Sequence, residues 1–111
     1  MTSSLRLTVL LFEEAPGTWV GQVLERDMAA HGPTMEAALA AIQAVLQAHV
    51  NFDTRHHREP LSRLNPAPEQ YWKAREHAET LHLNREFGML LPAHIDAVIS
   101  RQRPLPFTNT Q

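Results

Sequence analysis

The chain has 111 residues, 43% of them apolar, and a formal net charge of −2, so a single domain with an ordinary apolar core is expected. Its mildly acidic balance lacks the positive charge that nucleic acid or an anionic membrane attracts, so neither is expected as a partner. The absence of cysteine excludes disulfides, thiolate metal sites and a cysteine nucleophile.

The sequence predicts neither export nor a membrane span. Its first residues, MTSS, lack the basic and apolar regions of a secretion signal. No run approaches the roughly 18 apolar residues that a transmembrane helix requires. A cytoplasmic location is therefore the default expectation.

Three short strands are predicted in the first third of the chain. Residues 5–12, LRLTVLLF, partly alternate between two faces, and a second strand over residues 19–26 follows the Pro16-Gly17 turn. A third strand, residues 28–31, follows so closely that an antiparallel meander is the economical arrangement, since parallel pairing needs a long crossover.

A long amphipathic helix is predicted to begin at Met35. Thr34 has the residue type of an N-cap, and Glu36 places negative charge in the first turn, where the helix dipole favours it. The helix is expected to fray at residues 53–57. Its apolar stripe, at spacings of three and four, is predicted to comprise Ala38, Leu39, Ile42, Val45, Leu46, His49 and Phe52.

The second half of the chain is predicted to be an extension of this core. A proline-containing connector at residues 55–70 leads to a second helix over residues 69–81, and a possible strand at residues 85–92 precedes a short helix at residues 92–102. We therefore divide the chain into a core, residues 1–58, and an extension, residues 59–111. The extension is expected to pack on the core or on a dimer mate.

The segment LTVLLFEEAPGTWVGQVLERDMAAHGPTMEAALAAIQAVL resembles the HicB-like antitoxin superfamily over roughly residues 5–50. A strand that ends in acidic residues, a tight turn and a strand that opens with an aromatic residue carry the resemblance. So does a Gly-x-Thr junction before the helix, which Gly32, Thr34, Ala37 and Ala38 fit. The resemblance implies an α+β, partial RNase H-like fold, in which a small antiparallel sheet carries helices on one face.

The resemblance also implies a non-catalytic activity, in which a small basic, mRNA-cleaving toxin is bound and blocked, often by a dimer. Two family features are absent: VLERDMAAHG lacks the Pro-x-x-x-Gly-Cys-like insertion, and the second half lacks a complete DNA-binding module. The first hypothesis is therefore a protein-binding module of HicB-like fold without a cofactor. Two alternatives are a solitary, self-assembling regulatory or scaffold protein without a toxin and a metal-dependent hydrolase.

The Gly32-Pro33-Thr34 junction has two interpretations. A helix N-terminus presents free N–H groups and can bind an anion. A phosphate-binding loop, however, requires several glycines and usually a lysine, whereas this junction has one glycine, no lysine, and a proline that removes a donor. The sequence favours a structural junction, with Gly32 and Thr34 forming the turn and cap.

A weak candidate for a metal site lies near the end of the long helix. His49, Asp53, His56 and His57 recur at spacings that share one helix face, and imidazole and carboxylate groups bind zinc. The alternative is that His49 continues the apolar stripe, while the other histidines form a solvated helix end where cations suit the dipole. The sequence favours this alternative.

Four aromatic residues are candidates for binding a protein partner, because aromatic side chains are enriched at interfaces. They are Trp19, Tyr71, Trp72 and Phe87. Trp72 has the alternative role of packing the second helix onto the core. The open edges of a small sheet also favour pairing with a second copy, so a homo-oligomer is expected.

Overall fold

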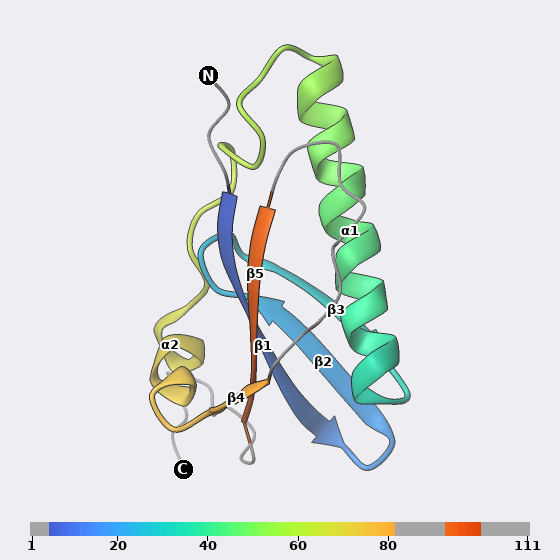
Figure 1. The fold of residues 1–111 in the computed structure, drawn as a ribbon, viewed down its shortest axis with the longest axis vertical. Coiled ribbons are helices and arrows are strands. Elements are labelled where there is room, and N and C mark those ends of the chain that lie inside the picture. Colours follow the sequence, from blue (N-terminus) through green and yellow to red (C-terminus); the bar gives the residue numbers. More distant parts are fainter. Residues whose placement is uncertain (1–4, 82–92, 101–111) are drawn as a thin grey trace, which may run out of the picture.

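A five-stranded mixed sheet and two helices make up the fold (Figure 1). The computed structural model describes residues 5–81 and 93–100. In chain order the elements are β1 (Leu5–Ala15), β2 (Thr18–Val23), β3 (Met28–Gly32), α1 (Met35–Arg55), α2 (Glu69–Arg75), β4 (Glu79–Leu81) and β5 (Ala93–Ile99). The strand order is β3-β2-β1-β5-β4, with β5 parallel to β1 and the other neighbours antiparallel.

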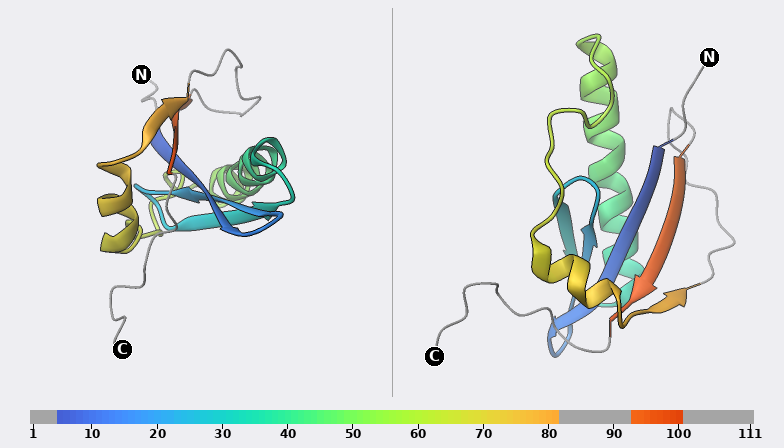
Figure 2. Two further views of the ribbon diagram at one scale, coloured as in Figure 1. Left: turned by 90° about the horizontal axis from the view of Figure 1, so that it is seen from below. Right: turned by 90° about the vertical axis from the view of Figure 1, so that its left-hand side faces the viewer.

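The two helices lie on opposite faces of the sheet, with α2 in front of it and α1 behind it in the right-hand view of Figure 2. The sequence of β1 explains this arrangement. Leu7, Val9 and Leu11 point toward α1, whereas Leu10 and Phe12 point toward α2, as the two-residue period of a strand requires. A central strand covered on both faces needs apolar residues on both.

The predicted α+β class is confirmed, while two details of the sheet differ from the prediction. The sheet is mixed rather than antiparallel, because β5 inserts beside β1 in parallel orientation. The helices cover two faces rather than one, because the connector before α2 carries it to the other side of the sheet (Figure 2).

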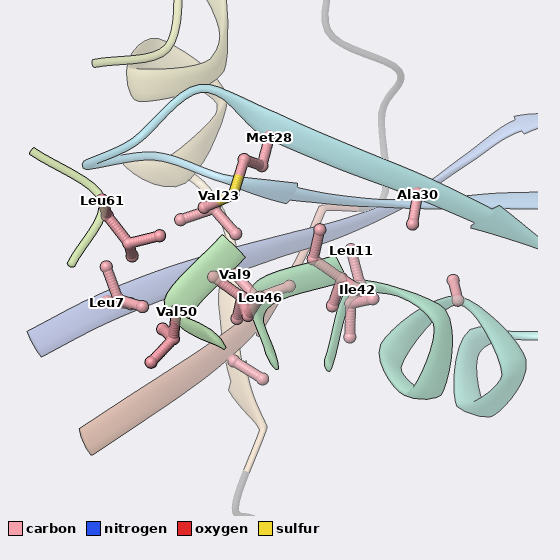
Figure 3. Close-up of a cluster of buried hydrophobic side chains, with 12 residues drawn as sticks. Leu7, Val9, Leu11, Val23, Met28, Ala30, Ile42, Leu46, Val50 and Leu61 are labelled. Atoms are coloured by element: carbon pink, nitrogen blue, oxygen red, sulfur yellow. The ribbon is translucent and has the colours of Figure 1, made fainter. Parts of the chain in front are cut away.

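The larger core lies between α1 and the sheet (Figure 3). The buried row of α1 ends, after a step of three residues, at Asp53, and from Ala38 to Val50 it advances in steps of four. Each such step exceeds a full turn by about 40°, so the buried row drifts around the helix. The predicted stripe is therefore wrong at Phe52, which is 41% exposed, and His49 is only half-buried. The buried row consists of Ala38, Ile42, Leu46, Val50 and Asp53.

The helix predicted at residues 92–102 is wrong, because residues 93–99 form β5. Ile95, Val98 and Ile99 have helical spacing, but Ile95 and Ala97 pack toward α1 while Val98 packs toward α2. A buried strand with neighbours on both sides is apolar on both faces, which hides its period. Because β5 pairs with β1 of the same chain, this part of the extension packs in cis, and the division at residue 58 stays an interpretation.

The remaining boundaries shift by a few residues or lie outside the described residues. The second helix ends at Arg75 rather than at residue 81, because residues 79–81 pair with β5 as β4. The strand predicted at residues 85–92, including Phe87, lies outside the described residues. Within the described ranges, no helix is long and apolar enough to cross a membrane.

Candidate functional site: a groove at the start of α1

A groove of about 360 Å³ lies where the sheet meets the first turn of α1. Three segments far apart in the sequence form it: β2, the junction between β3 and α1, and the end of β5. Its walls are mainly apolar, and one carboxylate lies at its lip. The lining residues are Trp19, Pro33, Thr34, Met35, Glu36 and Ile99.

The side walls of the groove are set by strand register. Trp19 in β2 lies opposite Gly32 in β3 on one side and opposite Glu13 in β1 on the other. Trp19 is half-buried and packs against the α1-side core, so its ring is held in place while part of it remains accessible. Ile99, also half-buried, lines the groove from the end of β5 and lies opposite Glu79 in β4.

The junction between β3 and α1, which contributes Pro33 and Thr34 to the lining, is fixed by a close backbone approach and a helix cap. A Cβ atom on Gly32 would lie 2.5 Å from the Ala38 nitrogen, so only glycine allows β3 to end this close to α1. Thr34 is extended, and its Oγ1 accepts a hydrogen bond from the Ala37 N–H at 3.0 Å. The cap satisfies one of the free donors of the first turn.

Three acidic side chains lie in the lining of the groove or next to it. Glu36 is exposed at its lip, in the first turn of α1. Residues directly opposite each other in antiparallel strands share a face of the sheet, which places Glu13 beside Trp19 and Glu79 beside Ile99. The Glu13 carboxylate also accepts a hydrogen bond from the Gly17 N–H at 3.1 Å. The result is an apolar groove with a negative rim.

The acidic member of the candidate metal site has another role. Asp53 is fully buried, its Oδ2 accepts a hydrogen bond from the Leu61 N–H at 2.8 Å, and its Oδ1 accepts one from Arg63 Nε at 3.1 Å. Arg63 Nη2 lies 3.0 Å from the same Oδ1. Burial alone would raise the pKa of Asp53, but these hydrogen bonds and the Arg63 charge outweigh it and lower the pKa. Through these interactions Asp53 holds the connector, at Leu61 and Arg63, against the end of α1.

The three candidate histidines occupy different settings. His49 is half-buried on α1. His56 follows the last turn of α1, and its ring centroid lies 4.3 Å from that of Phe52. His57 has a φ of 57° as the chain leaves the helix. Across the described residues, no three His, Cys, Asp or Glu side chains are grouped so that they could hold a metal ion.

Tyr71 and Trp72 lie away from the groove, on the opposite face of the sheet. The Tyr71 ring centroid is 6.0 Å from that of Phe12, and Trp72 Nε1 donates a hydrogen bond to the Ala67 carbonyl at 3.2 Å. Burial, followed by the charges of nearby Asp27 and Glu14, raises the pKa of Tyr71. These contacts give both rings a packing role under α2, and Trp19 is the described aromatic candidate that lies in the groove.

Sequence reasoning identified Trp19 and the junction separately but did not bring them together. The residue missing from that picture is Ile99, which the helical interpretation of residues 92–102 placed on the apolar side of a helix rather than at the end of a strand. In the sequence, the only sign that residues 93–99 form a strand was their β-branched and apolar composition. Comparisons of the chain with family models, curated proteins and solved structures find no match.

Proposed function

We propose that this chain is a non-catalytic protein-binding module of the cytoplasm, as the resemblance to HicB-like antitoxins implies. The groove at the start of α1 receives an apolar side chain of a partner protein. Basic residues that flank this side chain in the partner pair with the acidic rim. The partner is therefore a basic protein, as the small toxin implied by the resemblance would be.

The single observation that carries the proposal is the combination of apolar walls with an acidic rim. Trp19, Met35 and Ile99 offer apolar surface, and Glu36 is exposed beside them. Aromatic side chains that become fully desolvated at the centre of an interface contribute much of its binding energy. Charges at the rim chiefly steer the encounter and select partners of opposite sign.

The location of the groove supports the same conclusion. Pro33 and Thr34, from the Gly-x-Thr junction on which the resemblance rests, line the groove. The three antiparallel strands and α1 have the β-β-β-α order that the resemblance implies. Strand β5, which pairs with β1 in parallel, adds Ile99 to the lining of the groove.

The chemistry of the lining favours binding over catalysis. Glu36 is the one carboxylate among the lining residues, and the Thr34 hydroxyl caps α1. A hydroxyl nucleophile is activated by a general base within hydrogen-bond reach. The lining residues supply no such pair, whereas an apolar anchor needs only the surface that they present.

Affinity capture from native lysate tests the proposal when the wild-type chain and alanine variants of the two tryptophans are used in turn as the bait. Trp19→Ala removes the groove wall, and Trp72→Ala is the matched control because it removes a half-buried tryptophan from the other face. We expect the wild-type chain and Trp72→Ala to recover the same basic protein, released by high salt because salt screens the rim. Trp19→Ala should lose it while keeping a folded circular dichroism spectrum.

Two results would contradict the proposal. One is the recovery of the same partner by Trp19→Ala and the wild type. The other is recovery of the chain alone.

A further inference from the structure

The last turn of α1 carries an aromatic side chain among cations. Phe52 is 41% exposed, and it is the large apolar side chain that stands exposed among the described residues. The guanidinium carbons of Arg58 and Arg63 lie 5.9 and 5.1 Å from its ring centroid. Arg55, three residues after Phe52 and therefore its neighbour on the helix surface, is also exposed.

The surface around Phe52 is net positive. Residues 50–63 contain three arginines and two carboxylates. One carboxylate, Asp53, is fully buried and paired with Arg63, which leaves Arg55 and Arg58 against the exposed Glu59. An exposed apolar side chain flanked by basic residues is the kind of ligand that the groove at the start of α1 fits. The chain therefore carries the groove and a matching anchor at the two ends of one helix.

Phe52 cannot reach the groove of its own chain. Helix α1 runs along the vertical axis of Figure 1, with its first turn at the lower end and its last turn at the upper end. Phe52 lies 17 residues after Met35 of the groove lining, a rise of about 25 Å along the helix. A phenylalanine side chain is several times shorter than this distance, so its ring is available only to the groove of another copy.

We propose that a second copy of the chain docks head to tail, so that Phe52 of one copy enters the groove of the next. The ring packs against the apolar surface of Trp19 and Ile99. The arginines beside the ring approach the Glu36 carboxylate at the lip. This inference rests on the proposed function, because it uses the same groove and the same kind of anchor.

Charge complementarity selects this orientation over the two symmetric ones. Two copies that met groove to groove would bring their acidic rims together, and two copies that met at Phe52 would bring their arginines together. Like charges repel, whereas the head-to-tail contact brings opposite charges together. A contact between two different surfaces is heterologous, so it repeats from copy to copy and builds an open chain or a closed ring.

The head-to-tail contact is small and depends on concentration. One anchored side chain with a charged rim belongs to the small end of protein interfaces, where complexes are transient. The contact therefore forms at high protein concentration and is lost on dilution. The basic partner competes for the same groove, so partner binding and self-association exclude each other.

Light scattering over a range of protein concentrations tests the contact with two variants that each keep one half of it. Phe52→Ala keeps the groove, and Trp19→Ala keeps the anchor. We expect the wild-type mass to rise with concentration beyond that of a dimer. Each variant alone should stay monomeric, while an equimolar mixture should form a heterodimer and grow no further. A monomeric wild type, or a mixture of folded variants without a heterodimer, would overturn the proposal.

Substitutions of exposed residues provide a second measurement that leaves the core intact. Thr54→Ala, in the same turn as Phe52, is the matched control and should self-associate as the wild type does. Glu36→Arg should weaken self-association about tenfold, because it reverses the charge at the lip of the groove. An unchanged affinity in Glu36→Arg would contradict the head-to-tail contact.

Failure of this inference can be told apart from failure of the proposed function. Phe52→Ala should still recover the basic partner from lysate, since its groove is unchanged. Partner recovery by a wild-type chain that does not self-associate would refute the head-to-tail contact alone. Self-association through the groove without recovery of a basic partner would refute the proposed function alone.

Discussion

Replacing Asp53 with alanine is expected to lower the free energy of unfolding by about 3 kcal/mol, because a buried carboxylate that accepts several hydrogen bonds is lost. Its Leu61 partner has a fully buried side chain in the larger core and a φ of 64°, a left-handed conformation that costs a non-glycine residue energy. Asp53 holds Leu61 in this conformation. Arg63 is partly exposed and is solvated after the change, so most of the loss comes from the Leu61 N–H.

Urea unfolding at neutral pH measures this effect. Asp53→Asn keeps one carbonyl acceptor for Leu61 and should cost less than the alanine variant. Glu59→Ala removes an exposed carboxylate from the same connector and should change stability by less than about 0.5 kcal/mol, the usual range for surface changes. A loss in Asp53→Ala no larger than that of Glu59→Ala would contradict the role assigned to Asp53.

The contribution of Asp53 should also depend on pH in a defined direction. Burial alone raises its pKa, but the hydrogen bonds from Leu61 and Arg63 lower the pKa in the folded chain below the ordinary value of 3.8. A lowered folded-state pKa contributes stability that is fully present above the unfolded pKa and is lost as the pH falls through the folded-state pKa. The stability difference between wild type and Asp53→Ala should therefore be constant near neutrality and shrink below about pH 4.

The second large effect is expected for Gly32→Ala, which should lower the free energy of unfolding by about 3 kcal/mol through overpacking. The added Cβ would lie 2.5 Å from the Ala38 nitrogen and 2.7 Å from the carbonyl carbon of Ala37. These are backbone atoms of the first turn of α1, so the helix itself must move. Because Met35 and Glu36 of this turn line the groove, partner capture should also weaken.

Gly21→Ala is the matched control for this change. Its Cβ would lie 3.4 Å from the Ala38 carbonyl oxygen and from Ile42 Cγ2, contacts that a small adjustment relieves. Chemical denaturation of the two variants should show the smaller loss for Gly21→Ala. If Gly32→Ala is as stable as the wild type, the claim that only glycine fits between the end of β3 and α1 is contradicted.

The local part of the fold could be predicted because local patterns encode it. The alternation over residues 5–12 and the Pro16-Gly17 turn predicted the three-stranded meander, and Thr34 with the apolar spacing that follows it predicted the cap and α1. Each of these depends on neighbours within a few residues. The parallel strand β5 could not be predicted in this way, since its partner β1 lies more than 80 residues earlier in the chain.

The candidate site was only partly predictable for the same reason. Trp19 is conspicuous in the sequence, but a groove exists only once β5 brings Ile99 to the start of α1. Asp53 shared a helix face with histidines and so fitted a metal pattern. Its hydrogen-bond partners Leu61 and Arg63 lie in a connector whose sequence has no helical or strand periodicity. Leu61 adopts a left-handed conformation, which the sequence does not indicate because the residue is not a glycine.

The most direct test of the central claim, that the groove at the start of α1 binds a basic protein, is the fluorescence of Trp19. The chain has two tryptophans, so Trp72→Phe leaves Trp19 as the single reporter and keeps an aromatic ring under α2. Adding the captured protein to this variant should shift the Trp19 emission to shorter wavelength and saturate, and high salt should reverse the shift. A complex that forms while the Trp19 emission stays unchanged would contradict the claim.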